Sequence, residues 1–378
     1  MKIVQLCPYA MDRPGGVQRH VRDLSAWCSA EGHETRIVAP PAPGIGPRRA
    51  DGLIELGRAR AFAVHGTGFE ISRARRGEVR ALACELRDWG ANLVHLHTPW
   101  TPMLVWQVWR ALKLPTVMTI HATLPSTDSP APVDRYIRRA ARYFLTRTAI
   151  TVTPSGAPLP LIRQLAPDAE TVVLPPTVDL SDWRRAGDTR NAGKDLTLLF
   201  LGRLEDRKGV RMLLEAWRKV AGQVPNARLR IAGDGPLRGV VQAACSDRLT
   251  YVGRPDDTQA RALVADADLF IAPAPYGESF GIVLAEAMSA GAVPIAAANP
   301  GYASVLTGPG AELLVPPGDS AALAAKIVEL GRDTGKRRAL ADWGRSHAMQ
   351  FDVAQAGPDY LDQFRRALAL DTSNQAAG

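Results

Sequence analysis

Strand-like and helix-like segments alternate twice along this 378-residue chain, and the alternation limits its fold more than any other feature. In the first half, short runs rich in β-branched residues predict buried strands, and stretches with helical apolar spacing separate them. The expected strands are Lys2–Leu6, Thr35–Ala39, Leu93–Leu96, Thr116–Ile120, Ala149–Val152 and Thr171–Leu174. This alternation predicts a parallel, doubly wound sheet.

The alternation stops at Pro175–Lys194, a Pro/Asp/Ser/Gly-containing stretch without periodicity that we interpret as a linker. It then restarts with expected strands at Leu196–Leu201, Arg228–Ala232, Leu249–Val252, Leu269–Ala272 and Ala292–Ile295. We therefore predict an α/β protein with two doubly wound, Rossmann-like domains, residues 1–180 and 181–352, that face each other across a cleft. The last helical pattern, about 353–371, is expected to cross back onto the first domain.

Composition excludes several classes of protein. Hydrophobic residues make up 46% of the chain, which argues against global disorder. The four cysteines are widely spaced and form no paired motif, so we expect a reducing, cytoplasmic compartment. No long uncharged apolar run predicts a membrane-spanning helix, and the first residues lack the apolar region of a signal peptide.

Positive charge is concentrated in the first half of the chain. Residues 1–180 contain 22 Lys or Arg and 15 Asp or Glu, whereas residues 181–378 contain 24 and 23. A basic half favours anionic partners, which include nucleic acid, phosphate-bearing substrates and an acidic membrane surface.

Ligands of doubly wound sheets bind beyond the carboxyl ends of the strands, so the turns after strands are the segments to read for function. After the first strand, Gly15-Gly16 precedes a helix, whose N-terminal N–H groups could hold a phosphate. After the restart strand, Arg203 and Lys208 lie in a charged loop that could clamp a diphosphate. A plain tight turn and a solvated loop are the alternatives that these residues leave open.

Two carboxylates stand eight positions apart in the segment Tyr276–Glu286. Glu278 lies in a glycine-flanked turn, and Glu286 lies within an apolar helical pattern. A carboxylate in such surroundings needs a partner, because unpaired burial of a charge is costly. A sugar diol, with two hydroxyl donors, would satisfy it.

Taken together, these segments resemble the GT4 family of retaining glycosyltransferases, which have a GT-B fold. The matching pieces are Gly15-Gly16-Val17, Gly202-Arg203-Leu204 with Lys208-Gly209, the Glu278–Glu286 segment followed by Ala-Met-Ser-Ala-Gly, Glu31-Gly32-His33 and His95-Leu96-His97. The resemblance covers nearly the whole chain. The opening Cys7-Pro8-Tyr9 with Pro14–Gln18, and the segment Gly277–Glu286, are most similar to the phosphatidylinositol mannosyltransferases.

The resemblance implies roles for matching positions. In the second, donor-binding domain, Arg203 and Lys208 would hold the donor diphosphate with help from the Gly16 N–H, and Glu286 would bind the ribose. Glu278 would contact the hexose, together with the backbone of Phe280, Gly281 and Ile282. His121 matches the family histidine near the donor sugar, and Tyr9 and Gln18 fall on the acceptor side.

The resemblance also implies that no cofactor or metal is required, with a GDP- or UDP-linked sugar as substrate. His95 and His97 could share a strand face and hold a metal, but no third ligand is evident from the sequence. Two positions depart from the family. Pro176-Thr177 replaces the usual Asn-Gly near the linker, and Ala260 stands where relatives carry a lysine near guanine.

Basic, amphipathic segments in the first domain point to the acceptor. Glu70–Trp89 has helical apolar spacing and carries Arg73, Arg75, Arg76 and Arg80, as expected of a helix that lies on anionic lipid. A second set of arginines occurs in 135–142, interleaved with aromatic residues. We therefore expect a hexosyltransferase with a lipid or lipid-linked acceptor, peripherally bound to the inner face of the membrane.

Three other functions remain open from the sequence alone. The enzyme could use a soluble acceptor, such as a small metabolite or a glycan. The basic half could bind nucleic acid, although no recognisable nucleic-acid-binding module is present. A catalytically inactive sugar-binding module is disfavoured by the intact set Arg203, Lys208, Glu278 and Glu286.

Overall fold

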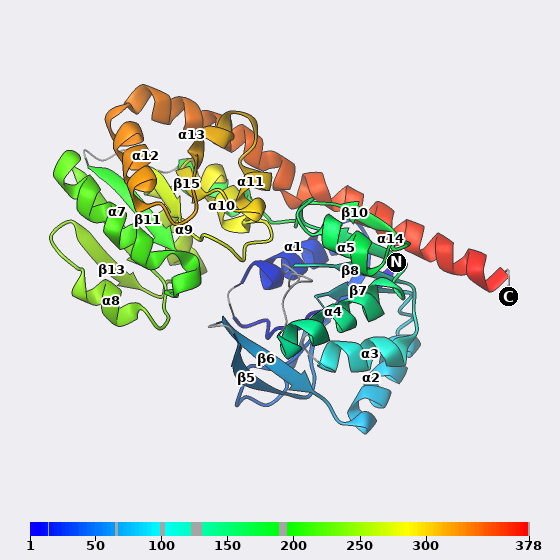
Figure 1. Ribbon diagram of the computed structural model, residues 1–378. Coiled ribbons are helices and arrows are strands. Elements are labelled where there is room, and N and C mark those ends of the chain that lie inside the picture. Colours follow the sequence, from blue (N-terminus) through cyan, green and yellow to red (C-terminus); the bar gives the residue numbers. More distant parts are fainter. Residues whose placement is uncertain (14, 65–66, 99–102, 122–130, 189–194, 377–378) are drawn as a thin grey trace. The chain divides into compact units, whose positions relative to one another are not determined.

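The protein forms two compact units in a computed structural model (Figure 1). The described residues are 1–378 without 14, 65–66, 99–102, 122–130, 189–194 and 377–378. Unit 1 comprises Met1–Val178 and Val353–Gly378, and unit 2 comprises Asp179–Asp352. The sequence placed these boundaries after residues 180 and 352.

Unit 1 is built on an eight-stranded sheet with the order β10-β9-β8-β7-β1-β2-β4-β3. Its strands are β1 (Lys2–Leu6), β2 (Glu34–Ala39), β3 (Arg49–Ala50), β4 (Leu53–Glu55), β7 (Leu93–His97), β8 (Thr116–Thr119), β9 (Ile150–Thr153) and β10 (Thr171–Val173). All neighbours pair in parallel except β3 with β4. The six strands predicted for this half are confirmed, and the chain order reverses between β1 and β7.

Helices cover both faces of this sheet. They are α1 (Gly16–Ala30), α2 (Arg76–Asp88), α3 (Met103–Leu112), α4 (Pro132–Leu145), α5 (Leu159–Leu165) and the C-terminal α14 (Val353–Ala376). One core packs α2, α3 and α4 against the sheet, and the other buries Leu24 of α1 with Tyr360 and Phe364 of α14. A Cβ at Gly357 would collide with the indole of Trp27, so this glycine lets α14 approach α1 closely.

A two-stranded antiparallel hairpin, β5 (Arg58–Val64) with β6 (Thr67–Arg73), precedes α2. The predicted helix over Glu70–Trp89 is therefore wrong in its first part, because the chain is a strand up to Arg73 and the helix begins at Arg76. The helical spacing holds only from Val79 onward, where Val79, Leu82 and Leu86 are buried.

Unit 2 contains a six-stranded parallel sheet with the order β13-β12-β11-β14-β15-β16. The strands are β11 (Leu196–Leu201), β12 (Ala227–Ala232), β13 (Leu249–Gly253), β14 (Leu269–Ala272), β15 (Val293–Ala297) and β16 (Leu314–Val315). Its helices are α6 (Ser181–Asp188), α7 (Val210–Gln223), α8 (Arg238–Ala243), α9 (Asp257–Ala265), α10 (Ile282–Ser289), α11 (Pro300–Val305), α12 (Ser320–Arg332) and α13 (Thr334–Ala348). The restarted alternation is confirmed, and the strand order reverses between β11 and β14.

The predicted linker is in part an ordered helix. Helix α6 belongs to unit 2, where Trp183 is 2% exposed, and residues 189–194 lie outside the described residues. A Cβ at Gly187 would collide with the backbone of Ala290, so α6 packs closely on the end of α10. One buried tryptophan in eight residues gives too little periodicity to predict this helix from sequence.

Among the described residues, no helix has both the length and the apolar character needed to cross a membrane.

Candidate active site

The two motif segments of unit 2 meet at the point where its strand order reverses. Strands β11 and β14 are neighbours, so the loops that follow their carboxyl ends lie side by side. The Lys208 Nζ atom lies 2.6 Å from Oε1 of Glu278. Two predictions made from separate parts of the sequence therefore fall in one site.

Arg207 and Glu205 complete a charged cluster that the sequence analysis missed. Arg207 donates from Nη1 to Glu278 Oε1 at 3.2 Å and from Nη2 to Glu205 Oε1 at 3.0 Å. Arg203 lies on the other oxygen of Glu205, at 3.3 Å. The signal for both residues is the charged run 205–208, in which the sequence alone predicts a role only for Lys208.

This donor cluster, defined as Arg203, Glu205, Arg207, Lys208 and Glu278, has three cations and two carboxylates. Glu205 is 4% exposed, so its charge depends on the two arginines that flank it. The Arg203 side chain is 53% exposed and can meet a ligand. The excess of one positive charge favours an anionic ligand such as a diphosphate.

Glycine positions hold the two loops together. Gly209 has φ 74°, and a Cβ there would collide with the carbonyl oxygen of Pro273, in the loop after β14. On the other side, a Cβ at Gly301 would collide with the carbonyl of Glu278. The loop after β11 is therefore packed closely against the loop after β14, and the Glu278 backbone is packed closely against Gly301.

The segment 280–286 forms the start of α10. Gly281, at φ 112°, precedes the first turn, and Tyr302 occupies the space where a Cβ would lie. The Phe280 ring is buried against Phe351, with ring centroids 5.2 Å apart, so only its backbone can face a ligand. Glu286 lies within α10 and is 9% exposed. The donor roles predicted for these residues and for the half-buried Ile282 stay predictions.

In unit 1, the predicted residue His121 follows β8 and joins a buried group of histidines. Its Nε2 lies 2.8 Å from Nδ1 of His97, the last residue of β7, and the two rings are stacked. His20 of α1 lies on the same group, with its ring centroid 5.2 Å from that of His121. Burial lowers the pKa of all three side chains, that of His20 to about 4, so all are neutral near pH 7.

His95 and His97, the pair that the sequence suggested as metal ligands, have ring centroids 4.1 Å apart, but the ring nitrogens that converge belong to a different set of three. His20, His97 and His121 have ring nitrogens within 4.8 Å of one another, whereas His95 donates to or accepts from Thr119 Oγ1 at 2.7 Å. The Thr177 backbone N–H donates to His20 Nδ1 at 2.9 Å, so the neutral ring carries its proton on Nε2. A metal-bound histidine usually donates its second ring N–H, whereas His20 Nδ1 here accepts from the Thr177 N–H, so this arrangement of His20 is a poor fit to a metal.

The turn after β1 contains the other predicted residues of unit 1. Gln18 is 8% exposed and donates from Nε2 to the Ala10 carbonyl at 3.3 Å, so its amide shapes the turn. A Cβ at Gly15 would collide with this amide. Gly16 is exposed as the first residue of α1, and Tyr9 is half-buried. Their contacts with donor and acceptor remain predictions.

The predicted basic surface lies on the hairpin and the start of α2. Arg73, Arg75, Arg76 and Arg80 are all exposed, although only the last two belong to the helix. Arg58 pairs directly with Arg73 across the hairpin, and Arg60 lies two residues further along β5. We call Arg58, Arg60, Arg73, Arg75, Arg76 and Arg80 the arginine surface. In the part of the chain that the structure describes, none of these guanidinium groups forms an ion pair.

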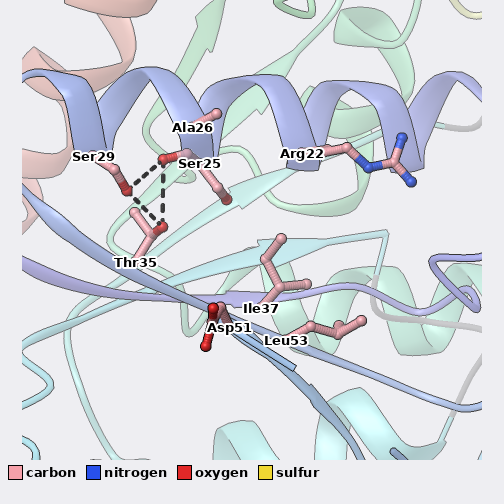
Figure 2. A pocket seen from close by; sticks show the side chains of 9 residues that line it. Arg22, Ser25, Ala26, Ser29, Thr35, Ile37, Asp51 and Leu53 are labelled. Carbon is pink, nitrogen blue, oxygen red and sulfur yellow. Dashed lines mark hydrogen bonds between the residues drawn. The ribbon is translucent and has the colours of Figure 1, made fainter. Parts of the chain in front are cut away.

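A pocket of about 410 Å³ lies elsewhere in unit 1, between α1 and the edge strands (Figure 2). Its lining includes Arg22, Ser25, Ser29, Thr35 and Asp51. Ser29 and Thr35 hydrogen bond to each other and to the Ser25 carbonyl. The pocket lies toward the amino end of β2, away from the loops where doubly wound folds bind ligands.

Comparison with known proteins matches both halves of the chain. The family "Glycosyltransferase Family 4" matches residues 14–182, and "Glycosyl transferases group 1" matches residues 182–347. A phosphatidyl-myo-inositol mannosyltransferase of Mycobacterium leprae is 31% identical over 358 residues, which cover 93% of each chain. A glycogen synthase of Mycobacterium tuberculosis is 27% identical over 76% of this chain and 75% of its own.

The fold is also similar to solved structures. Sucrose-phosphate synthase from Thermosynechococcus elongatus has a TM-score of 0.74 at 22% identity, over 98% of this chain and 99% of its own. The predicted GT-B fold, with two Rossmann-like domains, is confirmed. The match extends across the donor cluster and the histidine group alike, and the chain belongs to glycosyltransferase family 4.

Proposed function

We propose that this glycosyltransferase moves a mannose- or glucose-like hexose from a nucleoside diphosphate sugar to a membrane lipid or lipid-linked glycan. The observation that carries the proposal is the similarity, over 93% of both chains, to a relative named for transfer of mannose to phosphatidyl-myo-inositol. The exposed arginine surface in the same half of the chain supports an acceptor in an anionic membrane.

In this proposal the donor cluster binds the diphosphate. Lys208 and Arg203 contact its oxygens, and the backbone N–H groups of Phe280 and Gly281 assist. Negative charge grows on the diphosphate as the sugar–oxygen bond breaks. Cations that are already in place stabilise this charge most in the transition state, which is the condition for catalysis.

Glu278 and Glu286 hold the two ends of the donor. Without a donor, Glu278 forms ion pairs with both Lys208 and Arg207. A bound diphosphate would compete with Glu278 for Lys208. Arg207 then remains on Glu278 and keeps the carboxylate directed at the hexose hydroxyls. Glu286, within α10, takes the ribose hydroxyls.

We propose front-face substitution with retention at the anomeric carbon. The bond from this carbon to the diphosphate oxygen breaks, and a bond to the acceptor oxygen forms on the same face. A diphosphate oxygen takes the proton of the acceptor hydroxyl. Neither step uses a metal, so transfer should proceed at full rate with excess chelator, and the first product in an NMR time course should keep the donor's anomeric configuration.

The experiment that tests the acceptor offers both classes of acceptor to one preparation. UDP-, GDP- and ADP-sugars are first compared by thermal shift, because Ala260 leaves the choice of base open. The donor that binds is then supplied, radiolabelled, with phosphatidylinositol vesicles or with soluble glycans. Label in the lipid phase supports the proposal.

A soluble acceptor is the second candidate function, and the similarity to a glycogen synthase favours it. It predicts label in a water-soluble glycan, whether or not vesicles are present. We do not propose nucleic-acid binding or an inactive sugar-binding module, because membership of a transferase family and the assembled donor cluster both favour an enzyme.

A further inference from the structure

His121 is held at two points, by His97, the last residue of β7, and by Thr98, which follows it. Its ring nitrogen Nε2 lies 2.8 Å from Nδ1 of His97. Its backbone N–H donates to the hydroxyl of Thr98 at 2.9 Å. Thr98 thus holds the main chain of His121, and His97 holds its ring.

Hydrogen bonding at the far side of His97 determines which atom carries each proton. His97 Nε2 lies 2.9 Å from the amide oxygen of Gln5, on β1. An amide oxygen can only accept, so His97 Nε2 carries the proton and His97 Nδ1 has a lone pair. His121 must therefore donate from Nε2, which leaves its Nδ1 without a proton in the neutral ring.

The surroundings keep this chain of hydrogen bonds neutral. Gln5 and His97 are fully buried, and burial together with the neighbouring histidines lowers the pKa of both His97 and His121 well below its usual value. A proton added to either ring would abolish the donor–acceptor order, and on the fully buried His97 it would place a charge away from water. The arrangement thus has one stable set of tautomers.

Backbone strain at Thr98 indicates that the surrounding strands impose the geometry that holds His121. Thr98 has φ 36°, which is rarely adopted by a β-branched residue, and it is 1% exposed. Its N–H donates to the Thr119 carbonyl at 2.9 Å, so the strand ends of β7 and β8 hold it in this conformation. Strain of this kind is concentrated at sites where function depends on geometry.

We infer that His97, oriented by Gln5, is a positioning residue that fixes His121 as the neutral Nε2–H tautomer. In this tautomer His121 Nδ1 carries a lone pair and no proton, so it can only accept a hydrogen bond. This inference rests on the proposed function, in which His121 lies near the donor sugar. A hydroxyl of donor or acceptor that meets this ring must donate its hydrogen bond, and a group that can only accept is rejected.

Long-range proton–nitrogen NMR spectra of the full chain, with ¹⁵N-labelled histidine, test the tautomer directly. His121→Asn identifies the signals of His121. Wild type should show His121 protonated at Nε2 only. In His97→Asn the amide oxygen can take the place of Nδ1, so the same tautomer is expected. In His97→Leu the acceptor is lost, and His121 should become a mixture of tautomers. A wild-type His121 protonated at Nδ1 would overturn the inference.

Kinetics separate this role from a structural one. His97→Leu should lower kcat by about tenfold or more with little change in donor KM, because loss of a tautomer-fixing group slows other enzymes by up to about 10⁴-fold. His97→Asn should retain most of the activity. His95→Gln is the matched control, since His95 lies two residues away on β7, is equally buried, and bonds to Thr119 instead.

The outcomes distinguish this inference from the proposed function. If His95→Gln and His97→Leu lose activity equally while both fold, His97 has only a packing role and the inference fails. If the spectra show the Nε2–H tautomer but the wild type transfers no hexose to any acceptor, the positioning is correct and the proposed function is wrong.

Discussion

The sequence predicts some residues of the donor cluster and misses others. Arg203, Lys208 and Glu278 were predictable because each stands at a fixed place after a strand. Glu205 and Arg207 were not, because charged residues in a loop are usually solvated. Only the structure shows that Glu205 is buried between two arginines and that Arg207 links it to Glu278.

Arg203→Ala and Lys208→Ala should each lose activity far more than stability. Both side chains are at least partly exposed, so the fold does not depend on burying them. Loss of one charge that stabilises a leaving group typically lowers turnover by about 10²–10³-fold. The measurement is kcat beside the unfolding temperature, with the exposed Arg211→Ala as control. Unchanged turnover at saturating donor would contradict the assignment.

Glu286→Gln should weaken binding of a free nucleoside diphosphate, and Glu278→Gln should chiefly slow transfer. A hydrogen bond to a carboxylate is worth about 1.5–3 kcal/mol, or roughly 10- to 100-fold in Kd. Isothermal titration with the diphosphate isolates the ribose contact, because this ligand has no hexose. Equal loss of affinity in both variants would mean that the two roles are wrongly assigned.

Stability should fall as the pH drops below about 6.5, before surface carboxylates titrate. Burial lowers the pKa of His20 from 6.5 to about 4, so the unfolded chain binds more protons than the folded chain in this range. Between pH 6.5 and 5, His20 alone should cost about 2 kcal/mol of unfolding free energy. Denaturant titration at these two pH values measures it. His20→Asn should lessen the loss of unfolding free energy between pH 6.5 and 5. If this loss is the same in the variant and the wild type, His20 is not its source.

Among the helices and strands, the sequence predicts those whose apolar residues recur with a clear period. Eleven strands of the two sheets were predictable because β-branched runs between turn residues have few other interpretations, whereas the two- and three-residue strands β3, β4 and β16 were not predicted. The last four residues of β6, 70–73, are predicted as helix, since Ile71 happens to continue the spacing of Val79, Leu82 and Leu86. Helix α6 was read as linker, because its stability comes from Trp183 and a close contact at Gly187 rather than from its own pattern.

The hairpin and the start of α2 together should bind anionic membranes. Each basic residue near such a surface contributes about 1 kcal/mol, so replacing Arg73, Arg75, Arg76 and Arg80 by Gln should weaken binding roughly a thousandfold. Co-sedimentation with anionic and neutral vesicles at low and high salt measures this, and binding should decrease as salt rises. Adding Arg58→Gln and Arg60→Gln should weaken it further.

A matched control keeps the same change in net charge. Arg49, Arg163, Arg365 and Arg366 are exposed in unit 1 but lie outside the arginine surface. Their replacement by Gln should leave most vesicle binding intact. Equal release by both quadruple variants would show that net charge matters and the surface does not, and failure of the wild type to bind at low salt would favour a soluble acceptor.

At the scale of the whole molecule, each unit contributes a site at its own topological switch point. In unit 2 the reversal between β11 and β14 brings the donor cluster together, and in unit 1 the reversal between β1 and β7 brings Gln5 beside His97. The sequence could place these residues at strand ends. It could not show which of four histidines touch, because that depends on the packing of α1 and α14 against the sheet.

The central claim is that this transferase delivers a hexose to a lipid, and one assay tests it most directly. The purified chain is incubated with its preferred radiolabelled sugar nucleotide, phosphatidylinositol vesicles and a soluble glucan together, and the organic and aqueous phases are counted. We expect label in the organic phase, which should be lost in Lys208→Ala and reduced when the arginine surface is neutralised. Label confined to the glucan, with none in the lipid, would contradict it.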